Sequence, residues 1–160
     1  MAQDPFIVRA TTHPVATWWF RHIASRIDPV IFKLTNGKFF SMGPAVGPMV
    51  TIVMTGRKSG KQRQVHLGAV PFEGHLHVVA SAWGQERHPG WRYNLEADPV
   101  CVVQAPGERY AAFAEVLTDE EKAAIWPTVL EVIPQIGIYE TRTDRNIRVF
   151  RLRPAEEATG

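Results

Sequence analysis

Cysteine is almost absent from this chain, which has 160 residues and one cysteine, Cys101. A single cysteine excludes an internal disulfide and any metal site built from several thiolates. Cys101 lies in the apolar run Val100–Val103, which predicts a buried, inert thiol rather than a nucleophile. A reducing compartment agrees with this cysteine usage.

Long apolar runs and a strong charge of either sign are also missing. No stretch reaches the roughly 18 apolar residues of a membrane-spanning helix, and residues 1–4 show no basic leader before an apolar core. The formal net charge is +2, too small to indicate nucleic-acid binding by itself. We therefore expect a soluble, cytoplasmic protein without a nucleic-acid partner, whose N-terminal helix is its candidate for peripheral membrane contact.

Several catalytic signatures are absent as well. The chain has no Gly-x-Ser-x-Gly nucleophile elbow and no paired carboxylates outside a helix start. Three residues separate Gly56 from Gly60, so this stretch is not a P-loop. His75 and His77 share one face of a strand without a third ligand, which favours an exposed hairpin over a metal site. His66 is interpreted as a plain strand histidine, with a position facing a pocket as the alternative.

What is present indicates one globular domain, since 45% of the residues are hydrophobic and 21% are charged. Short apolar segments separated by glycine-bounded turns predict about six mostly antiparallel strands. The fold class is therefore α+β and mainly β, either a sheet or a small barrel. The segments are Pro48–Thr55, Arg63–Phe72, His75–Ala82, Val100–Ala105, Arg109–Val116 and Asn146–Leu152.

Helical periodicity appears in four places. Residues 14–33 predict a helix that Asp28-Pro29 would end or kink, with a stripe containing Trp18 and Trp19 that we expect to dock on the sheet. Pro89 begins a helix to about Ala97. Thr118-Asp-Glu-Glu121 is a capping box, and Pro127 would bend or divide the helix that follows. Residues 34–47 read as a glycine-rich loop, and 135–145 as a polar loop or short helix.

The most distinctive stretch is the basic turn Thr55–Arg63, which carries four cations, two glycines and two hydroxyls between two apolar segments. Its amides and cations could form a concave site for a phosphate or carboxylate. A solvated hairpin tip is an equally simple account. The start of the helix at Pro89 offers a second anion contact. Together with the tryptophans, these features favour a phosphorylated, planar ligand without specifying a reaction.

Several blocks of the sequence together resemble the deazaflavin-dependent nitroreductase family. They are Thr55–Gly60, Ala80-Ser81, Pro89–Pro99, Thr118–Glu121, Trp126-Pro127 and Tyr139–Asn146 with Thr143-Asp144-Arg145. The resemblance covers about residues 48–153. It implies a split β-barrel with an N-terminal helix and peripheral helices, divided into 1–47, a deazaflavin-binding domain 48–153 and a tail 154–160. It also implies an enzyme that uses reduced coenzyme F420 to transfer hydride to an electron-poor quinone, enone or nitroaromatic.

The family's binding residues can be placed by their matching positions. The resemblance implies that Arg57, Lys58 and Ser59 hold the phosphate and acidic tail of the coenzyme, and that Ser81–Trp91 with Asn94 lies along its ring and linker. The implied cofactor-binding set is Thr55, Gly56, Arg57, Lys58, Ser59, Arg63, Ser81, Ala82, Trp83, Gly84, Trp91 and Asn94, with Tyr139 in the substrate pocket.

Some family positions differ in this chain. Ala82 stands where the nitroimidazole-reducing members have a lysine, and Gly68, Ile133 and Ile136 stand where they have tyrosines. An aliphatic pocket favours a bulky apolar quinone or enone as acceptor. Two other classes remain open. One is a non-catalytic carrier of F420, a lipid or a tetrapyrrole, and Trp18, Trp19 and Phe20 would suit membrane delivery to a carrier and to an enzyme alike. The other is an FMN-dependent oxidoreductase. The assembly is a monomer or a homodimer.

Overall fold

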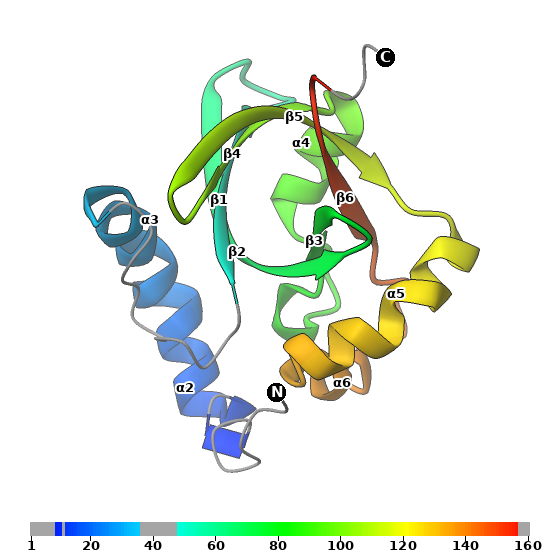
Figure 1. Ribbon diagram of the computed structural model, residues 1–160. Helices are drawn as coiled ribbons and strands as arrows, with labels where there is room; N and C mark the ends of the chain where they lie inside the picture. The colour runs from blue at the N-terminus through cyan, green and yellow to red at the C-terminus, as the bar shows by residue number, and fades with distance from the viewer. Residues whose placement is uncertain (1–8, 11, 36–47, 157–160) are drawn as a thin grey trace.

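A closed antiparallel barrel of six strands forms the centre of the molecule (Figure 1). The structure is a computed structural model that describes residues 9–10, 12–35 and 48–156. In barrel order the strands are β1 (Met49–Thr55), β2 (Gln62–Phe72), β3 (His75–Val79), β6 (Val149–Pro154), β5 (Glu108–Val116) and β4 (Val100–Ala105). This confirms the α+β, mainly β, split-barrel prediction. The predicted glycine-rich loop, apart from its first two residues, and the end of the tail lie outside the described residues.

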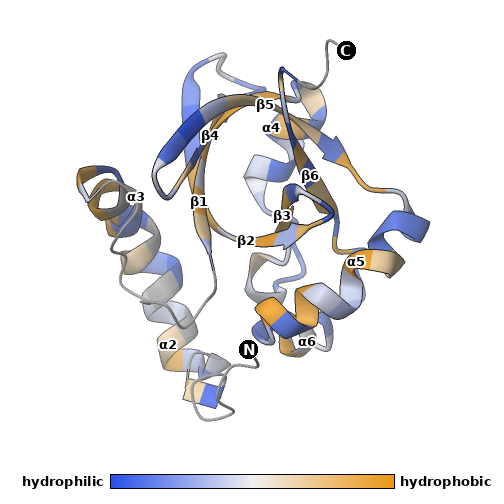
Figure 2. Ribbon diagram, viewed as in Figure 1, coloured by the Kyte–Doolittle hydropathy of each residue, from blue (hydrophilic) through white to orange (hydrophobic). Residues whose placement is uncertain are grey.

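The barrel forms because alternate residues of each strand are apolar and can fill its interior. Val50, Ile52, Val78, Phe150 and Leu152 are among the residues buried there. The predicted burial of the first strand on both faces is confirmed, since all but two of its residues are buried. The hydropathy colouring shows the contrast between the largely hydrophobic β1 and the hydrophilic turn between β4 and β5 (Figure 2).

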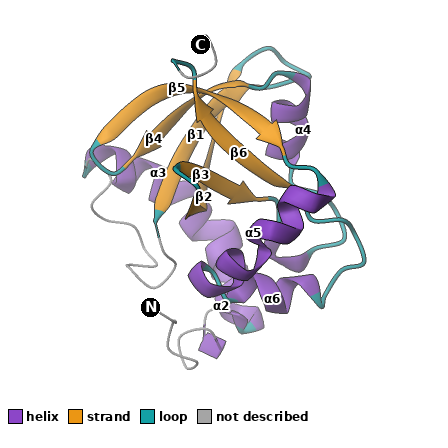
Figure 3. Ribbon diagram, turned by 45° about the vertical axis from the view of Figure 1, so that its right-hand side comes forward, coloured by secondary structure: helices purple, strands orange, loops and turns teal. Residues whose placement is uncertain are grey.

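A second core lies outside the barrel, where α5 (Asp119–Val132) and α6 (Gln135–Glu140) cover β2 and β3 (Figure 3). Ile125 and Val129 of α5 pack in one cluster with Val70 and Val79. The capping box is confirmed, and so is the short helix after Pro134. Pro127 does not divide α5, which continues through it to Val132.

The histidine hairpin is more buried than we predicted. His77 is 1% exposed, its ring lies 6.1 Å from that of Phe72, and burial lowers its pKa. The exposed-hairpin prediction is therefore wrong for His77, because the strand face that it shares with Val79 is the one that α5 covers. No group of three metal-binding side chains occurs among the described residues.

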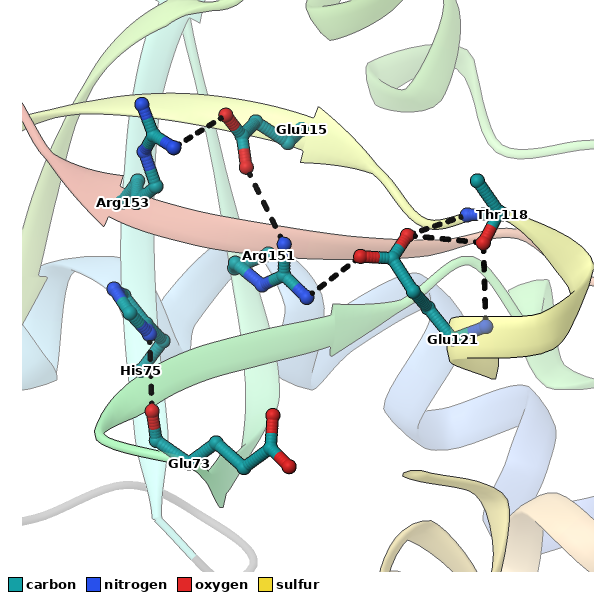
Figure 4. Close-up of polar contacts among 7 residues, drawn as sticks. All are labelled: Glu73, His75, Glu115, Thr118, Glu121, Arg151 and Arg153. Atoms are coloured by element: carbon teal, nitrogen blue, oxygen red, sulfur yellow. Dashed lines mark hydrogen bonds and ion pairs between the residues drawn. The ribbon is translucent and has the colours of Figure 1, made fainter. Parts of the chain in front are cut away.

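A polar network joins α5 to the strands (Figure 4). The Glu121 carboxylate accepts hydrogen bonds from the amide of Thr118 at 2.9 Å and from Arg151 at 3.0 Å. Arg151 and Arg153 in turn flank Glu115 at 3.5 and 3.3 Å. The first turn of α5 is thus tied to β5 and β6, and this fixes where the following helix lies.

The predicted N-terminal helix is present at nearly the expected bounds, but it presents a different face to the barrel. It consists of α2 (Pro14–Trp19), a π-helical turn η1 (Phe20–Ala24) and α3 (Ser25–Leu34), so Pro29 does not end it. Pro29 removes only one backbone hydrogen bond, and the bonds on either side can persist. None of the described helices is long and apolar enough to cross a membrane.

The prediction that its tryptophan stripe docks on the sheet is wrong. Trp18 is 56% exposed and Val30 is 53% exposed, whereas Ala24 and Asp28 are buried. The π-helical turn adds a residue to the helical repeat, and the face with Ala24 and Asp28 turns toward the barrel. The side chain of Phe20 lies outside the described part of the chain.

Two predicted strand boundaries also move. The third strand ends at Val79 and is followed by a short 3-10 turn, η3 (Ala82–Gly84), and by α4 (Gly90–Ala97). The last strand begins at Val149, three residues later than expected. Residues 80–82 and 146–148, which we expected in these two strands, lie outside them but still contact each other. The amide of Ala80 donates to the carbonyl of Arg148 at 2.9 Å.

Candidate functional site

A groove runs along the side of the barrel where β2 changes partner. β2 pairs with β1 over Gln62–Gly68 and with β3 over Ala69–Phe72, so among the described residues no strand covers the other edge of its first half. Two cavities lie along this edge, of about 430 and 530 Å³, and Val65, Gly90 and Trp91 line both of them. The two cavities therefore adjoin each other, and together they are called the groove.

The larger of the two is the basic cavity, which contains the predicted anion site. It is lined by Arg57, Lys58, Ser59 and Arg63 of the β1–β2 turn, with Asn94 from α4. The amide of Arg57 donates to Oδ1 of Asn94 at 3.2 Å, and its guanidinium carbon lies 5.1 Å from the ring centre of Tyr93. The turn is thus held against α4 with its cations around the cavity.

The amides of this turn are less available than predicted. Those of Ser59 and Gly60 donate to the carbonyl of Gly56, and that of Gly56 donates to the carbonyl of Lys61. Gly60 has a φ of 65°, which a glycine adopts without strain. These amides therefore close the turn instead of forming the expected concave anion site, and the side chains of Arg57, Lys58 and Ser59 remain as the candidate anion ligands.

The second cavity, called here the apolar cavity, has mainly hydrophobic walls. Met49, Val65 and Leu67 contribute from the strands, and Ile133 and Ile136 contribute from the ends of α5 and α6. Gly68, Ile133 and Ile136, the positions where related sequences were expected to have tyrosines, all line it, as does Tyr139.

Tyr139 lines the apolar cavity, and its role in a substrate pocket stays a prediction. It is 4% exposed, and its ring lies edge-on to Trp83 with the centroids 5.9 Å apart. Burial raises the pKa of Tyr139 to about 12, so its hydroxyl keeps its proton at neutral pH. The side chain can therefore donate a hydrogen bond within an otherwise apolar wall.

The segment after β3 forms part of the same wall in a strained conformation. Ala82 has a φ of 47° and Trp83 a φ of 57°, in the left-handed region that side chains disfavour. Gly84 is required for close packing, because a Cβ there would lie 2.8 Å from the carbonyl oxygen of Tyr139. Strain of this kind persists only where surrounding contacts enforce it, and no sequence pattern predicted it.

His66 lines the apolar cavity, so the alternative of a pocket position is confirmed. Its Nδ1 lies 3.0 Å from the hydroxyl of Thr51, on the neighbouring strand. Burial lowers the pKa of His66 to about 4, although Asp28 on the N-terminal helix opposes the shift. The imidazole is therefore neutral at pH 7 and accepts from Thr51 or donates to it according to its tautomer.

Most of the predicted site residues meet in this groove. Gly56, Arg57, Lys58, Ser59, Arg63 and Asn94 line the basic cavity, Ser81, Ala82, Trp83 and Tyr139 line the apolar one, and Trp91 lines both. Thr55 and Gly84 line neither. Gln85, Arg87 and His88 also line the apolar cavity and belong to the predicted segment Ser81–Trp91, whereas Arg21, which lines it too, was not assigned from the sequence. Cys101 is buried, and burial raises its pKa to about 11, as expected of an inert thiol.

The barrel and a groove that is cationic at one end and apolar at the other define a split-barrel oxidoreductase of the flavin or deazaflavin type. The chain belongs to the F420H(2)-dependent quinone reductase family, whose sequence model matches residues 25–154. This confirms the resemblance, the oxidoreductase class and reduced coenzyme F420 as the hydride donor.

Individual relatives agree with this assignment. The F420H(2)-dependent quinone reductase Rv1261c of Mycobacterium tuberculosis is 28% identical over 144 residues, which cover 86% of this chain and 97% of the relative. The solved structure of an F420-H2 dependent reductase, FDR-A, is 37% identical, with a TM-score of 0.62, covering 67% of this chain and 95% of that one.

Two further solved structures are informative. One described as a domain-swapped dimer is 31% identical with a TM-score of 0.63, covering 80% of this chain and 97% of that one. A heme binding protein from Mycobacterium smegmatis is 18% identical, with a TM-score of 0.52, over 69% of this chain and 47% of that chain. The second likeness shows the fold alone.

The buried His66 predicts a dependence of stability on pH. The unfolded chain takes up a proton at this residue near pH 6.5 and the folded chain only near pH 4, so the free energy of unfolding should fall as the pH falls through that window. The loss is at most about 3 kcal/mol, from a shift of this size. Urea unfolding of the wild type and His66→Asn between pH 7 and 4 measures it. Equal slopes in the two proteins would contradict a depressed pKa at His66.

Proposed function

We propose that this chain uses reduced F420 to reduce a bulky apolar quinone or enone in the apolar cavity. One observation carries the proposal: a single groove joins a cluster of cations to an aliphatic cavity. The residues fit the coenzyme, because a phosphorylated tail needs cations and hydrogen-bond donors, and a planar ring needs flat apolar walls. Family membership supports both ends of this assignment.

The side chains of the basic turn would hold the phosphate and acidic tail. The backbone amide of Arg57 is held by Asn94, and its guanidinium lies over the ring of Tyr93, so the guanidinium loses little freedom when an anion binds. Trp91, which lines both cavities, would contact the part of the coenzyme between its tail and its ring. When bound, the reduced coenzyme supplies the hydride, and the protein supplies position and exclusion of water.

The apolar wall would select the acceptor. Ile133 and Ile136 leave aliphatic surface where bulky rings can pack, and Ala82 supplies no charge for a nitro group. A quinone that accepts a hydride also needs a proton at its oxygen. The protonated hydroxyl of Tyr139 would donate a hydrogen bond to that oxygen and stabilise the negative charge that develops there.

The first prediction concerns the anion site. Arg57→Ala should raise the Kd for F420 about 10-fold or more, since a hydrogen bond to a charged group contributes roughly 1.5–3 kcal/mol. The free energy of unfolding should change by less than about 1 kcal/mol, because the turn lies at the surface. Titration of the purified protein with F420, followed by fluorescence, gives the Kd, and urea unfolding gives the stability.

Lys61→Ala is the matched control, because Lys61 belongs to the same turn but does not line the groove. It should leave the Kd for F420 within about twofold of the wild type, a change of less than about 0.5 kcal/mol. An equal loss in both variants would show that only the overall charge of the turn matters. A parallel titration with FMN tests the alternative cofactor, and tight FMN binding without F420 binding would overturn the proposal.

The second prediction concerns the acceptor. With reduced F420, kcat/KM should be at least about 10-fold higher for a menadione-type quinone than for a nitroimidazole. The quinone buries one additional ring face in an aliphatic pocket, and this burial stabilises the transition state by more than about 1.4 kcal/mol. Reoxidation of the cofactor gives the rates. Equal or faster turnover of the nitroimidazole would contradict this choice of acceptor, and no turnover of either would favour a carrier.

We also propose that the exposed face of the N-terminal helix contacts a membrane at the cytoplasmic side. Val15, Trp18, Ile27, Val30 and Leu34 are between 48% and 80% exposed, with Arg26 and Lys33 exposed among them. Apolar and tryptophan side chains beside cations are typical of helices at a lipid interface. This would bring a lipid-soluble quinone close to the groove.

Sedimentation with vesicles that contain anionic lipid tests this contact. The wild type should bind the vesicles, and Trp18→Ser with Val30→Ser should bind at least about fivefold less, since each exposed apolar side chain adds roughly 1–2 kcal/mol on burial. The wild type remaining in the supernatant would contradict the membrane contact. A concentration-dependent dimer that the two substitutions abolish would instead assign this face to a second copy of the chain.

A further inference from the structure

Arg145 lies outside the apolar cavity and hydrogen-bonds to the backbone of its strained wall. Its Nε donates to the carbonyl of Gln85 at 2.8 Å, one terminal nitrogen donates to the carbonyl of Ala80 at 2.8 Å, and the other donates to the carbonyl of Ser81. The nitrogen bound to Ala80 also lies 3.3 Å from Nδ1 of His88. One guanidinium thus spans the whole segment that follows β3.

The contacts enclose the two residues with positive φ. Ala82 and Trp83 lie between Ser81 and Gln85, whose carbonyls accept hydrogen bonds from Arg145. Each such residue costs roughly 1–3 kcal/mol, so the conformation needs outside support. The hydrogen bonds within the turn, from Gly84 to Ser81 and from Gln85 to Ala82, close it locally but do not attach it to the barrel.

The segment Ser81–Gln85 faces the cavity, whereas Arg145 does not. Ser81, Ala82, Trp83 and Gln85 line the apolar cavity, together with His88, but Arg145 is absent from its lining. Any effect of Arg145 on the reaction must therefore pass through these residues. It would set the position of the Trp83 ring against Tyr139, since these two rings are in edge-to-face contact.

The geometry requires an arginine in particular. Its acceptors here are carbonyl oxygens and a ring nitrogen, and no ion pair with a carboxylate is present at Arg145 among the described residues. A planar fork with five N–H groups can serve acceptors in several directions, whereas a lysine presents one compact ammonium. The pKa of His88 is lowered mainly by burial and further by the positive charges of Arg92 and Arg145. The lowered pKa keeps the imidazole neutral and able to accept a hydrogen bond.

We propose that Arg145 is a positioning residue for this reductase, a clamp that fixes the Ser81–Gln85 wall in the shape that hydride transfer requires. The inference rests on the proposed function, because the wall is assigned to the acceptor and the coenzyme ring. It adds a residue outside the groove to the determinants of turnover. It also explains why two residues with side chains occupy a conformation that usually selects glycine.

The experiment compares Arg145→Lys and Arg145→Ala with the wild type, with Arg109→Lys as control because Arg109 is an exposed residue of β5. In Arg145→Lys, kcat with a menadione-type quinone should fall at least about 10-fold. The Kd for F420 should change less than in Arg57→Ala, because the anion site is intact. Added guanidinium ion should restore part of the lost kcat in Arg145→Ala and should not affect Arg109→Lys.

A second readout needs no coenzyme. The near-ultraviolet circular dichroism of the free protein should lose the contribution of the packed Trp83–Tyr139 pair in Arg145→Lys, with Trp83→Phe identifying that contribution. Turnover of Arg145→Lys within twofold of the wild type, or an unchanged spectrum, would overturn the clamp. So would a lysine variant that fails to fold, since Arg145 would then serve global stability.

Different results would overturn the proposed function and the clamp. A wild type that binds F420 but reduces no quinone or enone would overturn the proposed function, while the spectrum of the free protein would still test the clamp. Turnover in the wild type with full activity in Arg145→Lys would overturn the clamp and leave the proposed function standing.

Discussion

The change of partner halfway along β2 is the constraint on which the site depends. In the described part of the chain, Gln62–Gly68 pair with β1 alone and Ala69–Phe72 pair with β3, so no strand there pairs with the other edge of the first half of β2. The chain fills that edge from outside, with the segment after β3, with α4 and with the ends of α5 and α6. The groove is the space that these elements do not fill, and each of its walls comes from a different part of the sequence.

Local patterns predicted most of the fold. The strands, the capping box at Thr118 and the turn after Thr55 each depend on neighbouring residues, and all are present. The errors arose where contacts between distant parts of the chain determine which residues are buried. His77 is buried because α5 covers it, and the helix with Trp18 presents its other face to the barrel after a π-helical turn. No spacing rule within one segment contains that information.

The candidate site shows the same division. Motif resemblance located the basic turn and the segment after Ala80, and the structure brings them into one groove. It did not show that the amides of the turn are used internally, nor that His66 lies in the cavity. Arg145 belonged to a recognised motif but had no assigned role, since its acceptors lie about sixty residues earlier in the chain.

The cations at one end of the groove lie on the β1–β2 turn and the start of β2, whereas the aliphatic wall at the other end is completed by the ends of α5 and α6. Mutations in one element therefore need not disturb the other. A gene duplicate could acquire a new acceptor by changing a few positions between Ile133 and Tyr139 while it keeps the inherited grip on the coenzyme. The basic turn and the α5–α6 wall lie far apart in the sequence, so each can change without altering the other.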